Sequence, residues 1–279
     1  MPTVRELSAP YENFMLGPRR GLGVCDTCFN LTDGYDECFA CSRLPSILDA
    51  VVPISYSVAR EQLHHALASY KRLDGDVARR LGLQLAAVLW RHLLAHEACV
   101  ARAGGADKFE LVATIPSGDQ LRDDSHPLHW IVSEVIGPTR DRYGRLLRRS
   151  AVDVEHRAFD AAKFEAVQRL DGRSVLLIDD TWTSGANAQS AAAALKSAGA
   201  GPVAALVIGR HVNREWRDND RRLKALPVPF DWSTCALCAA ALPLGGTSRL
   251  RDGVGRTGAP GLAVAEEHDL GLDCLDRVE

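Results

Sequence analysis

The sequence lacks any apolar run that approaches the roughly 18 residues needed by a membrane-spanning helix. It also lacks an apolar segment near its start, where Glu6 and Glu12 stand instead, so we expect no secretory signal and no membrane insertion. An excess of positive charge is missing too. The formal net charge of −3 at pH 7 gives no general attraction to nucleic acid or anionic membranes. We therefore expect a cytoplasmic globular protein.

The composition is that of an ordinary globular chain, with 46% hydrophobic and 25% charged residues in a length of 279. This length accommodates one sizeable domain plus appendages. We expect a flexible arm at residues 1–24, a four-cysteine module at 25–48, an α/β domain at 49–232 and a disordered, Gly-rich tail at 233–279 that begins near a cysteine pair.

The most informative stretch is residues 174–187. Four apolar residues, 175–178, precede two acids and a loop of small residues, and a helix is predicted over 188–198. A short continuous apolar run is typical of a strand buried on both faces of a parallel sheet. In an open α/β sheet, ligands bind beyond the carboxyl ends of the strands. The acids and the loop are therefore predicted to line a binding crevice.

The residue types in this stretch indicate a ligand. Hydroxyl groups in the loop and backbone N–H groups at the start of the helix suit a phosphate. Asp179 and Asp180 would repel that phosphate, so they need another role, and accepting hydrogen bonds from vicinal sugar hydroxyls is the natural one. The stretch predicts a site for a ribose 5-phosphate.

Residues 175–187 resemble the phosphoribosyl-pyrophosphate (PRPP) signature of the type I phosphoribosyltransferases, whose fold is an open, mainly parallel sheet flanked by helices. The resemblance implies that Asp179 and Asp180 hold the ribose and act as the catalytic residues. Asn187 stands where Thr is usual, and Trp182 is unusually large for the loop. The PRPP-binding positions implied by the resemblance are Thr181, Thr183, Ser184, Gly185, Ala186 and Asn187.

Two Cys-x-x-Cys pairs precede this domain, namely Cys25 with Cys28 and Cys38 with Cys41. Two such knuckles complete a tetrahedral site for structural Zn²⁺, and the alternatives are a redox pair or unliganded thiols. A third pair, Cys235 and Cys238, could bind a metal with a partner chain, replace one N-terminal pair or have no role.

The four-cysteine module, the Tyr70-Lys71 dipeptide and the PRPP-like motif occur in the order found in the ComF family of late competence proteins, over roughly residues 25–212. This similarity implies a zinc module joined to a phosphoribosyltransferase-like domain, with partners in DNA uptake or processing. Direct nucleic-acid binding by the module is disfavoured, because residues 25–43 contain one Arg and no Lys.

Pyrophosphate is expected to bind elsewhere in the domain. A second buried strand is predicted at residues 111–115, and Ser117 and Gly118 follow it, either as a pyrophosphate loop or as an ordinary turn. Where the ComF family has a basic segment, this chain has Asp123 and Asp124. An arginine-dense run follows, which either clamps pyrophosphate or is a solvated basic face; its candidate ligands are Arg145, Arg148 and Arg149.

A long amphipathic helix is predicted over residues 76–102. His92 and His96 lie on one face of it, but no Glu follows the first histidine as in a zinc-protease motif, so we expect packed or solvated histidines. Cys99 has no nearby partner in the sequence and is expected to behave as a small buried hydrophobic residue.

Two functional hypotheses follow. In the first, the protein transfers a 5-phosphoribosyl group from PRPP, with Mg²⁺, to an unidentified nucleobase or amine and releases pyrophosphate. In the second, the protein is a non-catalytic PRPP- or nucleotide-binding accessory of DNA uptake or processing. The PRPP-like motif supports both, the arginine run favours the enzyme, and the acids after Ser117 favour the binding protein.

Overall fold

The computed structural model describes residues 2–117, 126–155 and 158–240. Within these ranges the helices and strands run in the following order: α1 Val4–Ser8, η1 Ala9–Asn13, η2 Cys41–Arg43, β1 Ala50–Val58, α2 Gln62–Ser69, α3 Gly75–Ala103, β2 Leu111–Thr114, α5 Pro127–Trp130, η3 Ile131–Val135, α6 Gly137–Arg140, β3 Leu147–Arg149, β4 Phe164–Ala166, β5 Val175–Trp182, α7 Ala186–Ser197, β6 Val203–Val212 and α8 Asn219–Lys224.

The centre of the fold is a four-stranded sheet in the order β1-β6-β5-β2. Every pairing in it is parallel: Ala50 faces Ala204, Val175 faces Val203 and Leu111 faces Val175. Strands β3 and β4 form a separate antiparallel pair. The predicted α/β class with a parallel sheet is confirmed.

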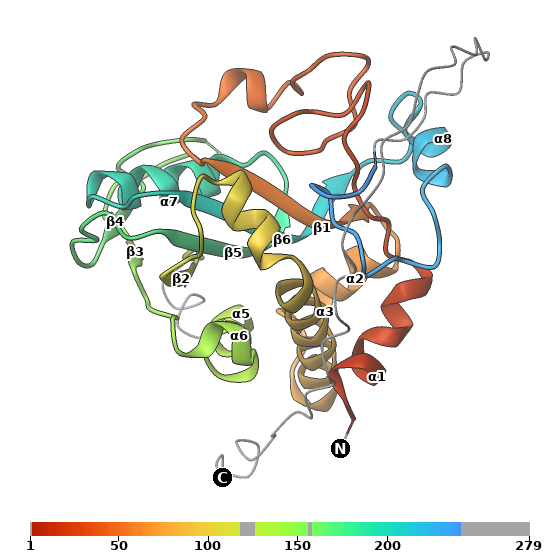
Figure 1. Cartoon of the computed structure of the whole chain (residues 1–279), viewed down its shortest axis with the longest axis horizontal. Coiled ribbons are helices and arrows are strands. Elements are labelled where there is room, and N and C mark those ends of the chain that lie inside the picture. The colour runs from red at the N-terminus through yellow and green to blue at the C-terminus, as the bar shows by residue number, and fades with distance from the viewer. Residues whose placement is uncertain (1, 118–125, 156–157, 241–279) are drawn as a thin grey trace, which may run out of the picture.

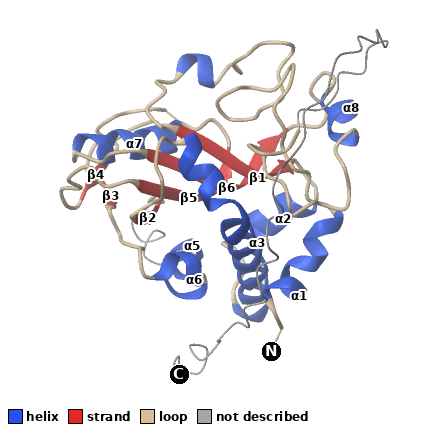
Figure 2. Cartoon of the chain, in the orientation of Figure 1, coloured by secondary structure: helices blue, strands red, loops and turns tan. Residues whose placement is uncertain are grey.

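Alternate residues of the strands feed two cores, one on each face of the sheet (Figures 1 and 2). Val52, Leu176 and Leu206 pack with α2 and α3 on one face. Leu177 and Ala205 pack with α7 and the cysteine module on the other. This arrangement follows from right-handed crossovers, because the chain crosses the sheet in opposite directions before and after β2. Because all four strands are parallel, their carboxyl ends share one edge of the sheet.

Residues 2–24 differ from the expected flexible arm. Thr3 and Glu6 form a capping box that starts α1, and Glu6 Oε2 accepts from the Thr3 backbone N–H at 2.8 Å. Tyr11 and Met15 are buried in the core that contains α3. The Thr-x-x-Glu pattern of the capping box is visible in the sequence. The burial of Tyr11 and Met15 is not, because the segment has little apolar periodicity and the two residues are buried only by contacts with distant parts of the fold.

Strand β1 continues to Val58 along β6, so α2 begins only at Gln62. The expected tail at 233–279 is described only to residue 240, and in this part Cys235 and Ala236 are buried. The rest of the predicted tail lies outside the described residues.

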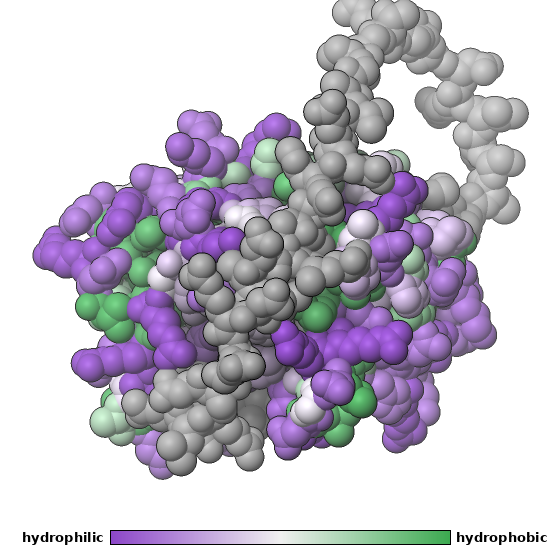
Figure 3. Space-filling model, turned by 90° about the horizontal axis from the view of Figure 1, so that it is seen from below, coloured by the Kyte–Doolittle hydropathy of each residue, from purple (hydrophilic) through white to green (hydrophobic). Residues whose placement is uncertain are grey.

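On the face drawn in Figure 3, most of the surface formed by the described residues is hydrophilic, and apolar residues form smaller separate patches. Among the described residues, no helix combines the length and the apolar character needed to cross a bilayer.

Candidate functional site

A cleft of about 650 Å³ lies at the carboxyl edge of the sheet. Its walls come from the end of β5, the start of α7, the segment after β2, the turn between α2 and α3, and His211 of β6. Most predicted site residues line it, namely Asp179, Asp180, Thr181, Thr183, Ser184, Gly185, Ala186, Asn187 and Ser117. Gly118 lies outside the described residues. The volume is within the usual range for small-molecule sites.

The two acids at the end of β5 have different environments. Asp180 is 3% exposed, and its Oδ2 accepts from the Tyr70 hydroxyl at 2.5 Å and lies 2.7 Å from Lys71 Nζ. Asp179 is partly buried, and its Oδ1 accepts the backbone N–H of Asp180 at 2.8 Å. Asp180 is thus held by a hydroxyl and an ammonium group, whereas Asp179 has one neutral donor.

These environments separate the two acidities. Burial, reinforced by the charge of Asp180, raises the pKa of Asp179 to about 7. Burial also opposes ionisation of Asp180, but the charge of Lys71 and the hydrogen bonds from Lys71 and Tyr70 outweigh it and hold the pKa of Asp180 below its usual value. Between about pH 4 and pH 7 the pair therefore carries one negative charge, on Asp180. Above about pH 7 Asp179 is ionised as well, and the pair carries two.

The loop after Asp180 places residues with hydrogen-bond donors along the cleft. Gly185 occupies the left-handed region at φ 89° and is the N-cap residue of α7, which begins at Ala186. Glycine has no side chain, so it cannot cap the helix N–H groups. Ser184 Oγ accepts the N–H of Ala186 at 3.3 Å. The first turn of a helix has four N–H groups without intrahelical acceptors, so this start offers partial positive charge to an anion.

Trp182 explains why glycine is needed at position 185. The indole is 2% exposed and lies under the loop, and a Cβ on Gly185 would approach Trp182 Cζ2 to 2.2 Å. The carbonyl of Trp182 accepts from Arg210 Nη1 at 3.2 Å. Trp182, which is unusually large for this position, is therefore a buried residue that supports the loop.

The four-cysteine module lies against the same support. Its cysteines belong to the core that contains Trp182 and Ala188, and Gln189 Oε1 of α7 accepts the N–H groups of Ile47 and Leu48 at 2.9 and 3.0 Å. The module and the first turns of α7 thus form one packed unit. A conformational change in the module would therefore be transmitted through these contacts to the loop that lines the cleft.

The sulfur atoms of Cys25, Cys28, Cys38 and Cys41 lie within 4.8 Å of one another. Three of these cysteines are buried, and Cys28 Sγ is 3.7 Å from Cys38 Sγ. This separation fits the edge of a tetrahedron around Zn²⁺ with Zn–S bonds of about 2.3 Å. The predicted four-cysteine cluster is confirmed, and it is suited to a structural metal such as zinc.

The permanent cations that line the cleft are not the predicted arginines. Among the described lining residues they are Lys71 and Arg72, in the turn between α2 and α3. The sequence presented Lys71 as part of the Tyr70-Lys71 dipeptide but gave it no role. Its contribution depends on a contact with Asp180, which is distant in the chain.

The predicted pyrophosphate arginines, Arg145, Arg148 and Arg149, do not line the cleft. Arg148 lies in β3, and its Nη2 is 2.7 Å from Glu165 of β4, with both side chains largely exposed. This part of the run is a cross-strand ion pair in the described structure.

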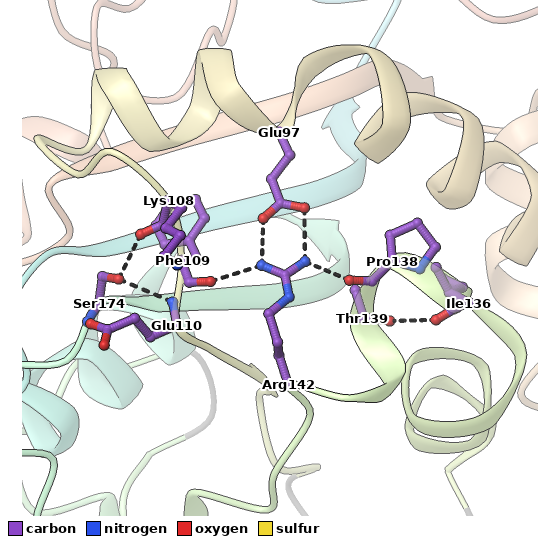
Figure 4. A network of polar contacts seen from close by, with 9 residues as sticks. All are labelled: Glu97, Lys108, Phe109, Glu110, Ile136, Pro138, Thr139, Arg142 and Ser174. Carbon is purple, nitrogen blue, oxygen red and sulfur yellow. Dashed lines mark hydrogen bonds and ion pairs between the residues drawn. The ribbon is translucent and has the colours of Figure 1, made fainter. Parts of the chain in front are cut away.

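Another member of the run, Arg142, has a structural role (Figure 4). Its guanidinium forms a two-pronged contact with Glu97 of α3, at 2.6 and 2.9 Å. It also donates to the carbonyl oxygens of Phe109 at 2.8 Å and Pro138 at 2.5 Å. Arg142 thereby joins α3, the segment before β2 and α6 on the side of the sheet that packs α3.

Comparison of the chain with protein-family models, curated proteins and solved structures found no match. The assignment of a function therefore depends on the geometry of the cleft and on the resemblance of its motif.

Proposed function

We propose that the protein is a PRPP-dependent phosphoribosyltransferase with a type I fold. It would transfer a 5-phosphoribosyl group to a nitrogenous acceptor, a nucleobase or an amine, with release of pyrophosphate. The observation that carries the proposal is the convergence in one cleft of an acid pair, a hydroxyl-rich loop at a helix start, and two cations. These three features match the hydroxyls, the 5-phosphate and the pyrophosphate of PRPP in turn.

The 5-phosphate would bind where α7 begins. Thr183 and Ser184 supply hydroxyl donors, and the N–H groups of Gly185 and Asn187 supply backbone donors at the positive end of the helix. The N–H of Ala186 would join them by exchanging Ser184 Oγ for a phosphate oxygen. This group does not react. Its binding energy can therefore be used to place the anomeric carbon, which raises the rate rather than only the affinity.

The ribose would lie against the acids. In its ionised form each carboxylate of Asp179 and Asp180 accepts hydrogen bonds from the ribose hydroxyls. Cleavage of the bond between the anomeric carbon and pyrophosphate creates positive charge on the ring, and the two carboxylates stabilise that charge. Ligand hydroxyls would replace part of the present coordination of Asp180 by Lys71 and Tyr70.

Lys71 and Arg72 would bind the departing pyrophosphate. Lys71 is one-third exposed and already reaches the acid that holds the ribose, so a small side-chain movement would bring it to an oxygen near the anomeric carbon. Ser117 and Gly118 would add donors. Mg²⁺ bound with PRPP would neutralise pyrophosphate oxygens, and the oxygens of Asp179 and Asp180 are suitable donors for it. A direct role for Arg145, Arg148 and Arg149 requires movement of the β3–β4 pair.

The second candidate is a ComF-like accessory of DNA uptake or processing that binds PRPP or a nucleotide without turnover. The specific observation in its favour comes from the sequence: Asp123 and Asp124, which lie outside the described residues, follow Ser117 where the ComF family has a basic segment. In that case the metal module would contact partner proteins, and its packing against α7 would couple ligand and partner.

Pyrophosphate release distinguishes the two. The purified full-length chain is incubated with PRPP and Mg²⁺ and a panel of nucleobases and amines, and pyrophosphate is measured with and without each acceptor. Acceptor-dependent release that is lost in Asp179→Asn/Asp180→Asn supports the enzyme. PRPP binding without release from any acceptor supports the accessory protein, and release unaffected by the double substitution contradicts the site.

A further inference from the structure

A second set of metal-binding side chains lies away from the cleft, where the segment after α8 meets helix α3. His96 and Cys99 come from α3, and Cys235 and Cys238 come from the last part of the chain that the structure describes. One ligand atom from each lies within 4.8 Å of the other three. None of the four lines the cleft, and none belongs to the N-terminal cysteine cluster.

The two halves of this set have the spacing of zinc ligands. His96 and Cys99 are three residues apart on a helix, so their side chains share a face. Cys235 and Cys238 form a tight turn in which Cys238 Sγ accepts the N–H of Cys235 at 3.1 Å. The carbonyl of Cys235 accepts the N–H of Ala239 at 2.9 Å. A Cys-x-x-Cys turn brings two sulfur atoms to one side of the backbone, which here faces the helical pair.

The orientation of His96 is that of a ligand. Its Nε2 lies 2.9 Å from the carbonyl oxygen of Trp232, which can only accept, so Nε2 carries the proton. Nδ1 is then left with its lone pair, and it lies 3.9 Å from Cys238 Sγ. Metal-bound histidines commonly donate their other ring N–H to a backbone carbonyl, which fixes the tautomer and the ring. The side chain is 4% exposed, so this orientation is held by packing.

The distances agree with a single ion. Zn–S bonds of about 2.3 Å and Zn–N bonds of about 2.0 Å at tetrahedral angles separate two sulfur atoms by about 3.8 Å and a sulfur from a nitrogen by about 3.5 Å. The separation of 3.9 Å between His96 Nδ1 and Cys238 Sγ is within about 0.4 Å of the second value. A disulfide between Cys235 and Cys238 would not explain why His96 Nδ1 and Cys99 Sγ lie within 4.8 Å of the same two sulfur atoms.

We propose that His96, Cys99, Cys235 and Cys238 bind a second Zn²⁺, in a Cys₃His site. Binding replaces three thiol protons with one divalent cation, and the protons go to solvent. Four protein ligands leave no open position, so the ion is structural. This site is independent of the proposed reaction, because it lies outside the cleft.

The ion would complete a joint between three distant parts of the chain. Glu12 accepts from Trp232 Nε1 at 2.8 Å, and Arg91 of α3 lies 2.6 Å from the same carboxylate. The Arg91 guanidinium also stacks on the Trp232 ring at 4.4 Å. The N-terminal segment, α3 and residues 230–239 thus meet next to the four ligands. The metal would hold the end of the described chain on α3.

Metal analysis of the purified full-length protein is the first test. We expect two zinc ions per chain in the wild type and one in Cys238→Ser, whose side chain is exposed and whose replacement disturbs little packing. Cys274→Ser, which removes a thiol outside the described residues, should keep both ions. One ion per chain in the wild type, or two in Cys238→Ser, would overturn the proposal.

Thiol alkylation of the wild type gives an answer that does not depend on a folded variant. An exposed free thiol reacts quickly, so protection of Cys238 from alkylation in the native protein requires a bond to sulfur. We expect protection of Cys99, Cys235 and Cys238 that is lost when a chelator removes zinc. Immediate labelling of Cys238, or protection that only a reductant removes, would refute the metal site and in the second case show a disulfide.

Discussion

Substitution of Gly185 by Ala tests whether the loop that lines the cleft has the rigid form described here. Two costs are expected. A residue with a Cβ in the left-handed region costs about 1–2 kcal/mol. In addition the new Cβ would approach Trp182 Cζ2 to 2.2 Å, and an indole that is 2% exposed has little room to move. Overpacking of this kind costs about 1–3 kcal/mol. The sum is about 2–5 kcal/mol.

Gly34→Ala is the matched control. Gly34 has the same φ of 89°, but a Cβ there meets nothing within 4 Å. Its cost should be the backbone strain alone, about 1–2 kcal/mol. The difference between the two variants therefore isolates the contact with Trp182.

The assay is chemical denaturation of both variants, with PRPP titration of each folded protein. We expect Gly185→Ala to be clearly less stable than Gly34→Ala and to bind PRPP more weakly, because relief of the contact displaces the donors that begin α7. Equal stability of the two variants would refute the packing of Trp182 beneath the loop. Unchanged PRPP affinity in Gly185→Ala would refute the loop as the phosphate site.

Three further outcomes are expected. Lys71→Ala should raise the pKa of Asp180, because the Lys71 charge is what offsets burial, and should weaken PRPP binding; carboxyl NMR and calorimetry measure the two, and an unchanged pKa would contradict the ion pair. Asp179, with a pKa raised from 3.8 to about 7, binds more protons when folded, so its contribution should lower the free energy of unfolding as pH rises from about 4 to 7. Denaturation across that range should show a flatter profile in Asp179→Asn, and identical profiles would refute the shift. Glu97→Gln should cost about 1.5–3 kcal/mol, because it weakens the two-pronged contact with Arg142 (Figure 4); a loss within about 0.5 kcal/mol would contradict the structural role of that network.

The sequence predicted the parts of the fold that depend on local pattern. The apolar run ending at Ile178 indicated β5, and the spacing of Cys25, Cys28, Cys38 and Cys41 indicated their cluster; both are present. The strand runs further than expected, to Trp182, because it continues to pair with β6.

The sequence could not predict contacts between distant segments. Cys99 was expected to behave as a small buried hydrophobic residue, but it is only partly buried and lies beside Cys235 and Cys238, which come from beyond β6. Lys71 received no role for the same reason, since its contact with Asp180 arises only when α2 folds onto the sheet. Periodicity and motif spacing report on neighbours in sequence, and these contacts are set by the order of the strands.

Calorimetric titration of the full-length protein with PRPP and Mg²⁺ tests the central proposal most directly. The proposal predicts saturable binding to the wild type and to Asp107→Asn, an exposed acid that precedes β2 at the opposite edge of the sheet from the cleft. It predicts loss of binding in Asp179→Asn/Asp180→Asn, with far-UV circular dichroism unchanged. Absence of binding to the wild type, or equal affinity in the folded double variant, would contradict the assignment of this cleft to PRPP.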